Sequence, residues 1–169
     1  MKRQKDVHAR WTRKRGKSHY GYRNHINIDK EHKLNRRYAV TDASVHDSQV
    51  FDGILDEENS DRSIWADSAY RSAAREEQLQ GQGHKSRIYR EGSGRRALTK
   101  REQESKHRRS KTRARVEHVF SDQRTAQESI LVRTKGKVCA ALQIGLMNLT
   151  YNMRPLEYLL RPQSVWCAG

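Results

Sequence analysis

The strongest constraint on the fold is one apolar pattern near the carboxyl end of the chain. Only 34% of the 169 residues are hydrophobic and 33% are charged, so a packed core has to come from a few segments. Between Lys137 and Leu160, seven apolar residues recur at steps of three or four: Val138, Leu142, Leu146, Leu149, Met153, Leu156 and Leu160. This spacing is typical of one face of a helix. The sequence therefore predicts a long core helix, which Pro155 either kinks or divides.

Charge is distributed along the chain in blocks. Lys and Arg number 35 against 20 Asp and Glu, which gives a net charge of +15. Residues 2–37 hold 13 basic and 3 acidic residues, residues 42–78 hold 3 and 10, and residues 84–115 hold 13 and 3. An excess of this size predicts contact with nucleic acid or another anionic surface. The blocks favour a metal-binding acidic centre between two phosphate-binding arms over a uniformly solvated surface.

Three classes of protein are disfavoured by the sequence. No apolar run reaches the ~18 residues of a membrane span, and the charged start lacks the apolar region of a signal peptide. Cys139 and Cys167 have no paired spacing with each other or with a nearby His, which argues against a zinc module. We therefore expect a cytoplasmic protein with reduced thiols and no membrane partner.

The alternation of apolar and polar residues predicts an antiparallel hairpin, with strands over residues 20–28 and 34–41 and a polar turn between them. A short amphipathic helix should follow, with Asp47 or Ser48 as its N-cap. Capping is the simplest role for Asp47. Residues 81–110 have no apolar period and read as a basic insertion that orders on a polyanion, or else as a linker without a partner.

Two carboxylates are candidate metal ligands. Asp67 follows a predicted strand over residues 63–66 and precedes a predicted helix over residues 69–80. Glu117 lies on a predicted helix over residues 113–127, in a sector of about 40° shared with Arg113 and Arg124. Carboxylates and phosphate oxygens are the ligands that Mg²⁺ prefers. From spacing alone the alternative stays open that these are surface charges and that Glu117 makes an ordinary intrahelical pair.

Four ordered motifs resemble the catalytic domain of bacterial insertion-sequence transposases with a DDE triad, in the group related to insertion sequences four and five. These motifs are Trp11–Arg23, Val40–Asp47, Trp65–Arg71 and Arg113–Phe120. The resemblance covers nearly the whole chain, from about Asp6 to Arg161. It implies an α/β fold, a ribonuclease-H-like mixed sheet with flanking helices, and Mg²⁺- or Mn²⁺-dependent cleavage and strand transfer at transposon ends.

The resemblance assigns roles by motif. Asp67 matches the second carboxylate of the triad and Glu117 the terminal one, both catalytic and metal-binding. Arg113 and Glu117 match the Arg and Glu of the family's Tyr-Arg-Glu-Lys signature, whereas Ser110 replaces its Tyr and Arg124 replaces its Lys. The basic residues expected to contact DNA are Arg13, Lys14, Arg15, Lys17, Arg113 and Arg124.

The first aspartate of the triad is expected upstream of Met1, on a first strand that this chain lacks. Asp6 and Asp29 are the nearest candidates, but Asp6 has a polar, non-strand context and Asp29 fits a turn. We therefore expect a carboxy-terminal fragment of a transposase. Its expected parts are a basic arm over residues 1–19, a truncated catalytic domain over residues 20–161 that includes the insertion 81–110, and a tail over residues 162–169.

The expected partners are transposon-end and target DNA, an amino-terminal fragment or intact transposase, and further copies in an oligomer on nucleoid DNA. Two alternatives remain. The chain could be a non-catalytic basic DNA-binding protein that inhibits an intact transposase, or a basic protein associated with RNA or the ribosome. The second leaves the order of the motifs unexplained.

Overall fold

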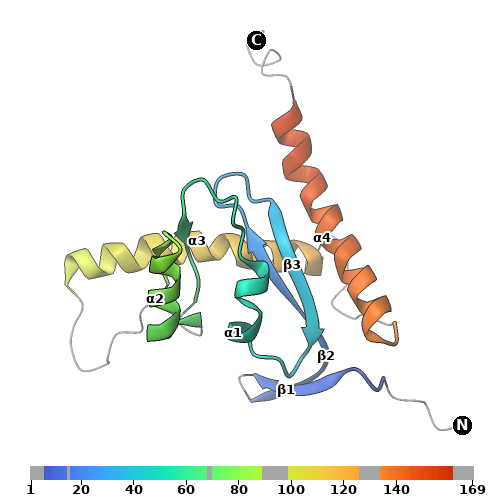
Figure 1. The fold of residues 1–169 in the computed structure, drawn as a ribbon. Helices are drawn as coiled ribbons and strands as arrows, with labels where there is room; N and C mark the ends of the chain where they lie inside the picture. Colours follow the sequence, from blue (N-terminus) through green and yellow to red (C-terminus); the bar gives the residue numbers. More distant parts are fainter. Residues whose placement is uncertain (1–5, 15, 68–69, 89–98, 126–133, 162–169) are drawn as a thin grey trace, which may run out of the picture.

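The computed structural model describes residues 6–14, 16–67, 70–88, 99–125 and 134–161. Its elements combine short strands with helices, so the predicted mixed α/β class is confirmed. The described strands form two separate sheets, one of three strands in the order β1-β2-β3 and one of two strands, β4 and β5. In Figure 1, α3 passes behind the larger sheet and α4 lies at its side. The ribonuclease-H-like arrangement remains a prediction.

The larger sheet is organised by its long middle strand. β2 (Lys17–Ile28) pairs antiparallel with β1 (Arg10–Lys14) through its first half and with β3 (Asn35–Asp42) through its second half. The predicted hairpin over residues 20–41 is therefore confirmed. Its turn is closed by the backbone amide of Asp29, which donates to the carbonyl of Leu34 at 2.8 Å. The predicted basic arm is in part a second hairpin, because β1 is a strand.

The helix expected after residue 46 is shorter than predicted. α1 (Asp47–Val50) ends after one turn and a 3₁₀ turn, η1 (Asp52–Ile54), follows it. The N-cap is His46, whose ring accepts from the Ser48 amide, so the prediction of Asp47 or Ser48 as the cap is wrong. Because His46 caps the helix, the carboxylate of Asp47 is available for other contacts.

The small sheet holds one hydrophobic core. β4 (Ser63–Ile64) pairs in parallel with β5 (Lys85–Ser86), and α2 (Ala73–Gly81) connects them from its N-cap Ser72. Four buried residues pack together there: Phe51, Ile64, Leu79 and Ile88. The loop predicted over residues 81–110 is thus wrong at residues 85–86, which form a strand, and at residues 100–110, which are helical.

Two long helices complete the fold. α3 (Lys100–Thr125) lies against β2, and α4 (Lys137–Leu160) contacts β2, β3 and α3. α4 continues through Pro155, so the alternative that this proline begins a second helix is wrong. None of the helices in the described part of the chain combines the length and hydropathy that a membrane crossing requires.

The apolar stripe of α4 is not in the core, which overturns the main prediction from its periodicity. The side of α4 that packs inward carries Ala140, Ile144, Asn148 and Tyr151. Asn148 accepts from Asn24 of β2 at 2.9 Å and from Gln123 of α3 at 2.8 Å. Asn152 bonds both backbone groups of Asn35, at 2.7 and 2.8 Å. Asparagine hydrogen bonds and the buried Ala140, Ile144 and Tyr151 therefore attach α4 to the fold, and the leucine stripe does not.

Candidate functional site

Asp67 lies three residues beyond β4, after the buried Ile64. It is half-buried, and its backbone carbonyl accepts from the Tyr70 amide at 3.1 Å. Burial, with smaller contributions from the negative charges of Asp47 and Asp67, raises the pKa of Tyr70 to about 12. The Tyr70 ring packs against Phe51, with ring centroids 5.5 Å apart. The small core thus holds the segment that carries Asp67.

Glu117 lies on the solvent-facing side of α3. The inward stripe predicted for this helix is confirmed at Val119, which is fully buried, and at the half-buried Val116, whereas Phe120 keeps 37% of its surface exposed. Glu117 itself is exposed. Arg124 is also exposed and lines a cleft, while the side chain of Arg113 lies outside the described structure.

A cleft of about 410 Å³ is lined by residues of β2, α3 and α4. Its polar lining comes from Lys14, Arg23, Asp47, Tyr70 and Arg124, among others. Asp67 and Glu117 do not belong to its described lining. Arg124 thus lies at a cleft that β2 also lines, and the two predicted carboxylates do not meet in its described lining.

Asp47 is the acidic residue in the described lining of this cleft, and its sequence context had predicted only a helix cap. Its Oδ1 lies 3.2 Å from Nδ1 of His25 and 3.1 Å from a guanidinium nitrogen of Arg23. The other nitrogen of the His25 ring lies 2.8 Å from the hydroxyl of Thr41. The hydrogen bond from His25, together with the Arg23 charge, lowers the pKa of Asp47 to about 2.

A signal for this cluster was present in the sequence. Arg23 and His25 are two residues apart, so they lie on the same face of their strand. His25 is buried, with 4% of its surface exposed, and a buried imidazole requires a partner. Asp47 supplies that partner from the start of α1. The cluster joins β2 to α1 and forms one wall of the cleft.

The two candidates for a first carboxylate are engaged in local structure. Asp6 accepts from the hydroxyl of Tyr22 at 2.7 Å and from the amide of Gly136 at 2.8 Å. Asp29 accepts from the amides of Glu31 and His32 in the turn after β2. Across the residues that the structure describes, no group of three or more His, Cys, Asp or Glu could hold a metal ion. These residues therefore do not form a complete divalent-metal site.

The basic hairpin of β1 and β2 is exposed. Arg13 and Lys14 lie on β1 and Lys17 on β2, and all three are exposed, while Arg15 is outside the described residues. Trp11 and Tyr20 face each other across the strands with ring centroids 5.1 Å apart. They keep 62% and 41% of their surfaces exposed. The hairpin therefore presents cations and two aromatic rings together.

Comparison with known proteins agrees with the motif order. Residues 1–153 match the family model described as "Transposase DDE domain". The chain is 29% identical over 116 residues to the transposase for insertion sequence element IS1106 of Neisseria meningitidis serogroup B. That match covers 69% of this chain and 40% of the relative, so the chain spans less than half of the relative's length. No solved structure matches the chain significantly. The chain belongs to the family of transposase DDE domains.

Proposed function

We propose that the chain is the catalytic part of an insertion-sequence transposase that binds transposon-end DNA and contributes to divalent-metal-dependent cleavage and strand transfer. The observation that carries this proposal is the family match over residues 1–153, which contains Asp67, Glu117 and the basic hairpin in one ordered stretch. The net charge of +15 supports an anionic partner. The IS1106 relative supports an insertion-sequence element as the setting.

Asp67 and Glu117 are proposed as the second and third carboxylates of the triad. The first would come from a residue outside those described, because the described residues do not gather three ligands. Mg²⁺ or Mn²⁺ would supply Lewis acidity at the scissile phosphate. This chain would hold Asp67 in the segment that follows β4 and Glu117 on the long helix α3.

The β1–β2 hairpin is the proposed DNA contact. Arg13, Lys14 and Lys17 project from a narrow two-stranded ribbon, and such a ribbon fits the major groove of DNA. The three cations would bind phosphates without reading sequence. The neighbouring Trp11 and Tyr20 rings add a surface on which unpaired bases can stack.

A strand-transfer assay with and without an added amino-terminal part of an IS1106-type transposase tests the catalytic proposal. We expect DNA binding by the chain alone and strand transfer only in the reconstituted mixture with Mg²⁺ or Mn²⁺. Asp67→Asn and Glu117→Gln should each lower strand transfer by about 100-fold or more while leaving DNA binding intact. Glu104→Gln, on the exposed side of α3, is the matched control. Strand transfer that survives Asp67→Asn would refute the assigned role.

DNA binding without catalysis is the second candidate. The observation that favours it is the lack of a three-ligand group among the described residues. In that case the chain would occupy transposon ends and inhibit an intact transposase. Equal DNA binding by the parent chain and Asp67→Asn, with no strand transfer in any mixture, would establish this function instead.

A further inference from the structure

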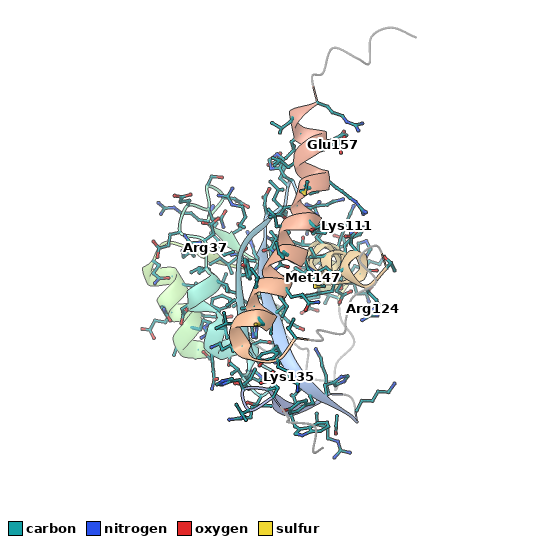
Figure 2. The ribbon with its side chains drawn as sticks, turned by 90° about the vertical axis from the view of Figure 1, so that its right-hand side faces the viewer. Arg37, Lys111, Arg124, Lys135, Met147 and Glu157 are labelled. Atoms are coloured by element: carbon teal, nitrogen blue, oxygen red, sulfur yellow. The ribbon has the colours of Figure 1, made fainter. Side chains whose placement is uncertain are left out.

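α4 has two opposite faces, and the described part of the molecule covers one of them. The covered face carries Ile144, Asn148 and Tyr151 and contacts β2, β3 and α3. On the other face, seven large apolar side chains keep between 45% and 82% of their surface exposed: Val138, Leu142, Leu146, Leu149, Met153, Leu156 and Leu160. At about 100° per residue, the two sets are centred on roughly opposite sides of the helix. Figure 2 looks onto α4, with the sheet behind it.

The exposed face has the spacing of a coiled coil. Apolar residues alternate at steps of three and four for three heptads: Cys139, Leu142, Leu146, Leu149, Met153, Leu156 and Leu160. Cys139 is exposed and acts as a small hydrophobic residue in this pattern. A sustained average step of 3.5 residues keeps a seam facing one partner helix, whereas a straight helix drifts from it. We call these seven residues the α4 seam; it is about 30 Å long.

The positions beside the seam carry almost no charge. They are Gln143, Gly145, Thr150, Asn152, Glu157 and Leu159. This neutrality is unusual in a chain in which 33% of residues are charged. Nucleic acid does not fit here, because phosphate binding needs cations. A partner of opposite charge does not fit either. The surface matches an apolar helix with neutral flanks.

A second copy of this chain presents such a helix. Two copies that meet seam to seam bury both apolar stripes in one isologous contact. The neutral flanks also keep the like charges of two strongly basic molecules away from the contact. Contiguous apolar patches of this length are rare on monomers and mark association sites.

We propose that the α4 seam is a self-association surface through which two copies of the chain pair helix to helix. The pairing requires neither DNA nor catalysis, so it is independent of the proposed function. Its loss would leave DNA binding by a single chain intact. Failure of DNA binding would likewise leave the pairing unchanged.

Analytical ultracentrifugation of the full chain without DNA, over a wide range of concentration, tests the proposal. We expect a monomer–dimer equilibrium for the parent chain. Leu149→Glu places a charge in the middle of the seam and should weaken dimerisation by at least about 100-fold, because two carboxylates would be buried against each other. Leu149 is exposed in the single chain, so the variant should keep its helical circular dichroism. If it does not, Leu146→Glu in the next layer provides the same test.

Tyr158→Glu is the matched control. Tyr158 lies on the same helix, is 75% exposed and points away from the seam, so this variant should dimerise like the parent chain. A second readout is alkylation of Cys139 in a Cys167→Ser background, which should slow as the chain becomes more concentrated. A parent chain that stays monomeric at all concentrations would overturn the proposal and assign the seam to another segment. Dimerisation of Leu149→Glu at parental strength would also overturn it.

Discussion

At the scale of single residues, the ionised carboxylate of Asp47 holds Arg23 and His25 together at one wall of the cleft. Its pKa is lowered to about 2 from an ordinary 3.8, because His25 and Arg23 stabilise the charged form. A carboxylate with a lowered pKa stabilises the fold above its unfolded pKa, and this stabilisation is lost as the pH falls from about 3.8 to about 2. Asp47 therefore makes the fold sensitive to acid.

We expect Asp47→Asn to lose less stability on acidification than the parent chain. The difference in free energy of unfolding between pH 5 and pH 2 should be about 1–2 kcal/mol smaller, allowing for solvent screening of a partly exposed carboxylate. Urea denaturation at a series of pH values measures this difference. Asp61→Asn, at an exposed position, is the control and should follow the parent chain. An acid transition in Asp47→Asn identical to that of the parent would contradict the assignment.

At the scale of elements, the sequence predicted segments well but not the side on which each one packs. The hairpin over residues 20–41 was predictable because period-2 alternation is a local property of a strand. The existence of α4 was predictable because apolar steps of three and four residues are a local property of a helix. Its buried face was not, because Asn148 and Asn152 pack inward through hydrogen bonds to distant residues. A periodicity shows that a stripe exists and leaves its partner unspecified.

Two further differences have local causes. α3 begins at Lys100 because Thr99 and Glu102 form a capping box, in which the Glu102 carboxylate accepts from the Thr99 amide at 2.8 Å. That signal was readable in the sequence, although the surrounding charges suggested a loop. β5 consists of Lys85 and Ser86 alone. It carries no alternation of its own, and its pairing with β4 alone identifies it as a strand.

We expect Asn148→Leu to destabilise the packing of α4 on the sheet by about 2–4 kcal/mol. Asn148 is buried, and its loss would leave the donors of Asn24 and Gln123 without their partner. Denaturant unfolding measures the cost. Changing Asn24 and Gln123 to leucine as well should recover part of it, because apolar groups need no hydrogen bonds. Asn148→Leu with parental stability would show that these contacts contribute little.

At the scale of the whole molecule, two exposed surfaces differ in their chemistry. The β1–β2 hairpin presents the cations Arg13, Lys14 and Lys17 beside two exposed aromatic rings, whereas the α4 seam is apolar. The cation blocks were predictable from the sequence, since charge does not depend on packing. The positions of Asp67 and Glu117 relative to each other were not predictable, because residues 50 positions apart come together only through tertiary structure. We propose the cationic hairpin as the DNA contact and the apolar α4 seam as the contact with a second copy of the chain.

If the hairpin is the main DNA contact, its charges should dominate the salt dependence of binding. Replacing Arg13, Lys14 and Lys17 by glutamine should reduce the slope of log affinity against log salt on duplex DNA by about 1–3, because each phosphate contact contributes about 0.9. Fluorescence anisotropy at several salt concentrations measures the slope.

The matched control replaces Lys33, Arg36 and Arg37 by glutamine, which removes the same net charge. Arg36 and Arg37 lie within 4 Å of the Asp56 carboxylate, at 3.1 and 3.7 Å, so they are already partly neutralised. Equal slopes in the two variants would show that DNA responds to the total charge of the molecule and not to the hairpin.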